Sequence, residues 1–138
     1  MTDQITRAKA VIGGGYAELI PGVAEFAYPI GELEPAQRLR AKLDSMHSDA
    51  WITVVGAGPT GIETAAELAG HAHKVTLVCG GRLGPALSQR ARRSTANWLA
   101  TRRVVVLESD TVVEVRSNAV VFADGAVRPS ALTIWTVN

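Results

Sequence analysis

Residues 51–61 read WITVVGAGPTG, and this stretch decides the fold class. Its first half, Trp51–Val55, is rich in β-branched residues, which is typical of a strand buried on both faces of a parallel sheet. Its second half, residues 56–61, turns the chain into a helix expected at Pro59–Gly70, because proline is tolerated in the first turn of a helix. Another strand is expected at residues 74–79. A strand, a helix and a strand within about 30 residues form a βαβ unit.

The turn between this strand and this helix has the pattern GxGxxG. Gly56 permits a tight turn, Gly58 leaves no side chain between the backbone and a pyrophosphate, and Gly61 lets the helix pack closely on the strand. The free N–H groups and the positive end of the helix dipole would face the diphosphate. The turn, including Pro59 and Thr60, therefore predicts a dinucleotide-binding site; the alternative is a tight turn that binds nothing.

The second half of the dinucleotide pattern is an acidic residue about 20 residues further on, which holds the adenosine ribose. It should fall near Cys79, but no Asp or Glu occurs between Glu67 and Glu108. A carboxylate there would repel a 2′-phosphate, whereas Arg82 could attract one. We therefore expect the site to tolerate or prefer NADPH. The alternatives are a solvated loop arginine at Arg82 and a small buried strand-end residue at Cys79.

The rest of the chain predicts an α/β fold, with a Rossmann-like parallel sheet, flanking helices and a three-stranded antiparallel β-meander at about 110–128. Residues 1–31 are expected to be an irregular lead-in or crossover segment, and residues 32–138 the nucleotide-binding domain. Within the lead-in we expect a strand at 10–12, then a glycine turn at 13–15 rather than a second dinucleotide site. The other expected elements are helices at 35–47 and 86–101 and strands at 104–107, 112–115, 119–122 and 132–137.

Composition limits the function further. The chain has 138 residues, 47% of them hydrophobic, and a net charge of +1, so it has one sizeable core and no global field that attracts nucleic acid. No apolar run is long enough to span a membrane, and the polar residues 1–9 lack the apolar centre of a secretory signal, so we expect a cytoplasmic protein. The single cysteine forms no internal disulfide. The spacing of His71 and His73 favours a polar turn over a metal site.

The chain resembles the NAD(P)H-binding segment of FAD-dependent pyridine nucleotide-disulfide oxidoreductases. The resemblance rests first on residues 54–69, VVGAGPTGIETAAELA, and then on shorter matches: IPG at 20–22, QRLR at 37–40, RLGP at 82–85, ADG at 123–125 and LTIWT at 132–136. The nearest branch holds type II NADH dehydrogenases and apoptosis-inducing-factor-like proteins. The family implies a pyrophosphate turn at 56–61, and it places Glu63 near the nicotinamide; the alternative for Glu63 is an acid favoured by the helix dipole.

The resemblance also implies that the chain is an NAD(P)H domain excised from a larger enzyme, in which the nicotinamide passes a hydride to FAD. The chain alone is then expected to bind NADH or NADPH weakly at best, to bind no FAD, to contribute no catalytic residue and to show no turnover. Its two ends are expected to lie close together. A stand-alone dinucleotide sensor is the alternative. A methyltransferase is disfavoured, because the strand before Gly56 ends in Val55 rather than an acid.

The arginines at 90, 92, 93, 102 and 103 are interpreted as a solvated helix face, with docking on the flavin domain as the alternative.

Overall fold

The structure is a computed structural model, and it describes residues 20–29 and 33–137. Its helices are α2 (Val23–Phe26), α3 (Leu33–Ser45), α4 (Pro59–Gly70) and α5 (Gln89–Thr101). Its strands are β1 (Ala27–Pro29), β2 (Trp51–Val55), β3 (Lys74–Val78), β4 (Val105–Leu107), β5 (Val112–Val115), β6 (Ala119–Phe122), β7 (Val127–Pro129) and β8 (Leu132–Trp135).

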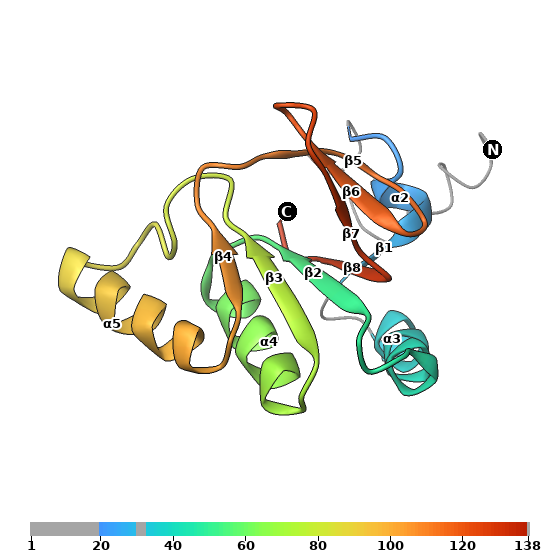
Figure 1. The fold of residues 1–138 in the computed structure, drawn as a ribbon, viewed down its shortest axis with the longest axis horizontal. Coiled ribbons are helices and arrows are strands. Elements are labelled where there is room, and N and C mark those ends of the chain that lie inside the picture. Colours follow the sequence, from blue (N-terminus) through green and yellow to red (C-terminus); the bar gives the residue numbers. More distant parts are fainter. Residues whose placement is uncertain (1–19, 30–32, 138) are drawn as a thin grey trace.

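The strands form two sheets (Figure 1). The larger sheet has five strands in the order β1-β8-β2-β3-β4, and every pair in it is parallel. The smaller sheet is the antiparallel meander β5-β6-β7. Both the parallel sheet and the meander were predicted, so the α/β fold class is confirmed.

The two faces of the parallel sheet carry different covers. Figure 1 shows α3, α4 and α5 on one side, and α2 and the meander on the other. Alternate residues of one strand point to opposite faces, so Ile52 and Val54 join the core beneath the helices, while Val55 joins the core beneath the meander. Both faces are therefore covered, and in such sheets ligands bind at an end of the strands. The carboxyl ends of β8, β2 and β3 lie together at one such end.

The prediction of an irregular lead-in was wrong for residues 23–29. They form α2 and β1, and β1 pairs in parallel with β8, Ala27 opposite Thr133 and Pro29 opposite Trp135. Proline is tolerated there because β1 is an edge strand, where a missing N–H breaks no ladder. The predicted strand at 10–12 and the turn at 13–15 lie outside the described residues, as do the two chain ends. The strands described nearest those ends, β1 and β8, lie side by side.

Three predicted elements differ from the structure by two residues or more at a boundary. Helix α3 spans Leu33–Ser45, two residues earlier than predicted. Helix α5 begins at Gln89, because the Ser88 hydroxyl accepts a hydrogen bond from the N–H of Ala91 and caps the helix there. Strand β8 ends at Trp135, where the chain turns across the end of β2. Among the described residues, no helix is both long enough and apolar enough to cross a membrane.

Candidate functional site

The turn between β2 and α4 lies at the open carboxyl end of the sheet. Gly56 has a φ of 116°, in the region that L side chains rarely adopt, and its N–H donates to the carbonyl of Val78 on β3 over 2.9 Å. Gly58 is the N-cap residue of α4 and has an extended backbone, with φ −77° and ψ −174°. The chain therefore passes from buried strand to helix in three residues, Gly56 to Gly58.

The glycines of the turn differ in what surrounds them. A Cβ at Gly56 would meet the side-chain oxygen of Thr136, and one at Gly61 would overlap the carbonyl oxygen of Gly56. Both positions require glycine for packing within the protein. A Cβ at Gly58, by contrast, would meet nothing within 4 Å. Gly58 thus leaves an open approach to the backbone that the fold itself does not use.

The start of α4 has backbone donors that find no acceptor among the described residues. No side chain caps the helix, and no acidic residue lies in its first turn. The first hydrogen bond of the helix runs from the N–H of Ile62 to the carbonyl of Gly58. Within the described parts of the chain, the N–H groups of Gly58, Thr60 and Gly61 donate to no other residue. Such N–H groups and the positive end of the helix dipole form an anion-binding site.

A cavity of about 440 Å³ adjoins this turn, between the start of α4, the loop that follows β3 and helix α5. Its walls are mainly apolar, and the residues that line it are Gly58, Pro59, Ile62, Glu63, Gly84, Pro85, Ala86, Leu87 and Thr95. A mostly apolar cavity with a few polar groups is typical of a small-molecule site. The predicted site residues Gly58, Pro59 and Glu63 therefore share one cavity, and Glu63 is the one ionisable residue among the described residues of its wall.

Cys79 and Arg82 follow β3 and do not line this cavity. Cys79 is half-buried, and burial raises the pKa of its thiol from 9.0 to about 11, with the negative charge of Glu108 adding to the shift. The thiol is therefore neutral at physiological pH and is a poor nucleophile. Arg82 is exposed and, among the described residues, forms no ion pair. Its guanidinium is available to an anionic ligand.

Sequence reasoning missed Glu108, an acidic residue beside Cys79. Val78 on β3 lies opposite Leu107 on β4, so the next residues along the two strands, Cys79 and Glu108, are neighbours. The Glu108 carboxylate accepts a hydrogen bond from the N–H of Leu83 over 3.0 Å. An acidic residue at the end of the neighbouring strand was the available signal, but the predicted pattern looks for an acid on β3 itself.

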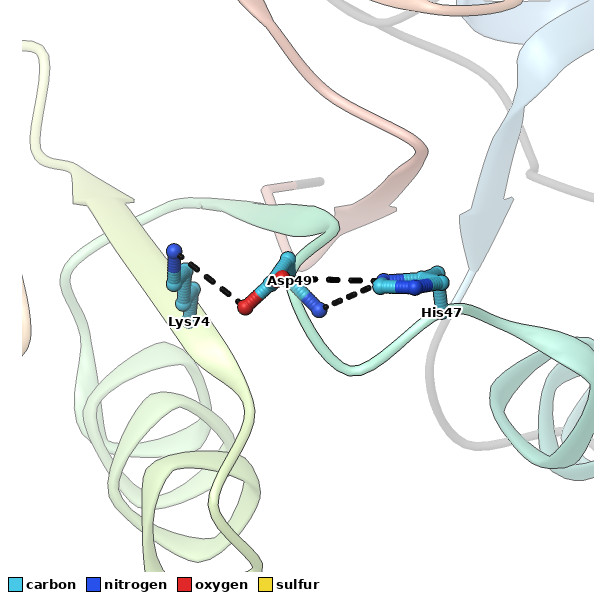
Figure 2. A network of polar contacts seen from close by, with 3 residues as sticks. All are labelled: His47, Asp49 and Lys74. Atoms are coloured by element: carbon cyan, nitrogen blue, oxygen red, sulfur yellow. Dashed lines mark hydrogen bonds and ion pairs between the residues drawn. The ribbon is translucent and has the colours of Figure 1, made fainter.

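A separate group of charged residues lies at the opposite end of the sheet (Figure 2). Asp49, just before β2, is 3.7 Å from Nζ of Lys74 at the start of β3, and its N–H donates to Nδ1 of His47 over 3.1 Å. All three residues are exposed, so the network contributes little to stability. In the described ranges, no three His, Cys, Asp or Glu residues are grouped so that they could hold a metal ion.

The family model described as pyridine nucleotide-disulphide oxidoreductase matches residues 3–137. The chain belongs to this family. The NADH dehydrogenase-like protein YutJ of Bacillus subtilis is 25% identical over 140 residues, which cover 97% of this chain and 39% of YutJ. A NADH dehydrogenase-like protein of Mycobacterium tuberculosis is 42% identical over 60 residues, which cover 39% of this chain and 15% of that protein. The chain thus spans well under half of each relative.

Solved structures share the fold. The NDH2 of Plasmodium falciparum in complex with NADH has a TM-score of 0.78 at 21% identity, over 90% of this chain and 32% of that one. An engineered water-forming NADPH oxidase bound to NADPH has a TM-score of 0.77 at 19% identity, over 86% of this chain and 27% of that one. At these identities the likeness establishes the fold. The matched part is about a third or less of each neighbour.

Proposed function

We propose that the chain is the NAD(P)H-binding part of a flavin-dependent oxidoreductase and that the turn at 56–61 holds the pyrophosphate of the nucleotide. The main support for this proposal is the open space beside Gly58. Nothing in the fold requires glycine there, because a Cβ would meet nothing within 4 Å, and within the described residues the N–H groups of Gly58, Thr60 and Gly61 have no acceptor. A diphosphate needs both that space and those donors.

The residues of the cavity would orient the nucleotide. Pro59 and Glu63 stand in its wall beside Gly58. Glu63, on the first turns of α4, would hold polar groups of the nicotinamide end by accepting hydrogen bonds. Thr60 supplies an N–H to the pyrophosphate. The nucleotide, when bound, supplies a hydride, and the flavin of a separate domain would accept it; the protein supplies binding and orientation.

The choice between NADH and NADPH is proposed to depend on Arg82. The site has no acidic residue at the end of β3, and the nearby Glu108 carboxylate is engaged by the N–H of Leu83. Arg82 is free to pair with a 2′-phosphate. The NADPH-bound neighbour carries five engineered changes, among them the loss of one aspartate and the gain of two arginines. We propose that this site accepts NADPH as well as NADH.

The domain organisation is part of the same proposal. Residues 32–138 would form the nucleotide-binding domain, and residues 1–31 would form the segment through which the chain crosses from an FAD domain. The pairing of β1 with β8 supports this, because the entering and leaving segments then lie side by side. FAD would belong to the other domain and not to this chain.

Calorimetric titration of the full chain with NADH and NADPH tests the proposal. The wild-type protein should bind, and Gly58→Ala should weaken binding about tenfold or more, since its methyl group blocks the phosphate. Gly70→Ala is the matched control: a Cβ there also meets nothing within 4 Å, but it lies at the other end of α4. Absent binding, or equal binding by both variants, would contradict the proposal.

A further inference from the structure

Arg92 lies on α5, and its guanidinium contacts the loop that follows β3. Its Nε donates to the carbonyl of Leu83 over 2.8 Å, and its Nη2 donates to the carbonyl of Leu87 over 2.9 Å and lies 3.5 Å from that of Gly84. One guanidinium thus joins three carbonyls of a single loop. The planar fork of arginine suits such multiple contacts, whereas a lysine presents a single point of charge.

Arg92 differs in this respect from the other four arginines that were interpreted as a solvated helix face. Arg90, Arg93, Arg102 and Arg103 are exposed, whereas Arg92 is partly buried and points into the loop. Arg102 lies over the ring of Trp98, 4.3 Å from its centroid. The interpretation of a solvated helix face is therefore wrong for Arg92, and Arg102 and Arg103 are exposed but follow the end of α5.

The loop held by Arg92 contacts the dinucleotide turn directly. The N–H of Gly84 donates to the carbonyl of Ala57 over 3.0 Å. Glu108 also holds this loop, because its carboxylate accepts a hydrogen bond from the N–H of Leu83. Gly84 has a φ of 56°, and a Cβ there would overlap the side chain of Leu87, so this position of the loop requires glycine.

The contact between Gly84 and Ala57 sets the direction of a donor in the turn. The carbonyl of Ala57 and the N–H of Gly58 belong to one planar trans peptide unit, so they point in opposite directions. When Gly84 holds the Ala57 carbonyl toward the loop, the Gly58 N–H must point away from it. That N–H has no acceptor in the described parts of the protein, and a Cβ at Gly58 would meet no atom within 4 Å.

We infer that Arg92 is a positioning residue for pyrophosphate binding, which acts by holding the Leu83–Gly84 loop so that Gly84 orients the Ala57–Gly58 peptide. This inference rests on the proposed function, in which the Gly58 N–H binds the diphosphate. Arg92 does not touch the nucleotide. Its effect comes from the geometry of the guanidinium fork and not from its charge.

The test compares Arg92→Ala, Arg92→Lys and Arg93→Ala in the full chain. Titrations with NADH and with inorganic pyrophosphate measure affinity, and the amide resonance of Gly58 in the ligand-free protein reports the orientation of its peptide. Arg92→Ala and Arg92→Lys should both weaken binding about tenfold and displace the Gly58 resonance, while that of Gly70 stays in place. Arg93→Ala removes the same charge from an exposed position on the same helix and should match the wild type.

Two results would overturn the inference: an unmoved Gly58 resonance in Arg92→Ala, or wild-type affinity in Arg92→Lys, which would show that charge suffices. Should Arg92→Ala not fold, Glu108→Ala removes the other support of the loop and should displace the Gly58 resonance in the same way. Failure of the wild-type chain to bind any nucleotide would instead contradict the proposed function. The position of the Gly58 resonance would still decide the inference.

Discussion

The hydroxyl of Thr136 lies 2.8 Å from the carbonyl oxygen of Val55, a residue 81 positions earlier in the chain. The N–H of Thr136 donates to the same carbonyl over 2.9 Å, and its hydroxyl is also 3.4 Å from the carbonyl of Gly56. The segment that leaves β8 therefore closes over the end of β2. Thr136 thereby holds the peptide units Val55–Gly56 and Gly56–Ala57, and the N–H of Gly84 holds the following one, Ala57–Gly58.

Thr136→Val should destabilise the protein by about 1 kcal/mol, the usual net value of one hydrogen bond. The Val55 carbonyl keeps the N–H of Thr136 as a partner, so no buried acceptor is left empty. Urea unfolding measures the change. The control is Thr101→Val. The Thr101 hydroxyl donates to the carbonyl of Trp98 at an exposed position, so its loss should change the free energy of unfolding by less than about 0.5 kcal/mol. Equal effects of both substitutions would contradict the closing role of Thr136.

Gly61→Ala and Gly58→Ala should separate folding from binding. A methyl group at Gly61 overlaps the carbonyl oxygen of Gly56, so the variant should lose about 2 kcal/mol or more of stability through overpacking. A methyl group at Gly58 meets no protein atom within 4 Å, and its stability should change by less than about 1 kcal/mol. Thermal unfolding followed by circular dichroism checks both. A Gly58→Ala variant as unstable as Gly61→Ala would mean that the space at Gly58 is needed by the fold.

Cys79 should react slowly with alkylating reagents in the folded protein. Its pKa of about 11 leaves very little thiolate at pH 8, and the rate should rise with pH toward that value. In urea the thiol should react with its ordinary pKa. Glu108→Gln should lower the pKa of the Cys79 thiol in the folded protein only slightly, because burial is the larger cause of the shift. Rapid alkylation at pH 8 would contradict this.

The raised pKa of Cys79 also has a consequence for stability. The unfolded chain releases the thiol proton at a lower pH than the folded chain, so between about pH 9 and 11 the unfolded state binds fewer protons. Stability should therefore fall as the pH rises through this window, and Cys79→Ser should reduce that fall. Urea unfolding at a series of pH values measures it. If stability fell equally with pH in the wild type and in Cys79→Ser, groups other than Cys79 would cause the loss of stability.

Arg82→Ala should lower the affinity for NADPH about tenfold and leave that for NADH within about twofold, because only NADPH carries the 2′-phosphate. Parallel titrations with the two nucleotides provide the comparison. Arg90→Ala removes another exposed arginine, from α5, and should affect neither nucleotide specifically. Equal losses for NADH and NADPH in Arg82→Ala would refute the role in recognising the phosphate.

The parts of the fold that could be predicted from sequence are those set by residues close together in the chain. β2, the turn and α4 follow from one stretch, because strand propensity, glycine spacing and the proline at Pro59 act locally. The meander was predicted for the same reason: Asp124–Gly125 forms a tight turn, with Gly125 at a φ of 90°. β1 was not predicted, because its three residues are too few to show a hydrophobic period and include Pro29.

The groups that hold the turn in place were beyond such reasoning. Thr136, Gly84, Arg92 and Glu108 come from separate elements, and they converge only because β8, β2, β3 and β4 are neighbours in the sheet. Local patterns do indicate a glycine turn suited to a diphosphate. The order of the strands decides which side chain orients each peptide of that turn and which carboxylate stands beside Cys79, because hydrogen bonds form between groups that are close in space, however far apart they are in the chain.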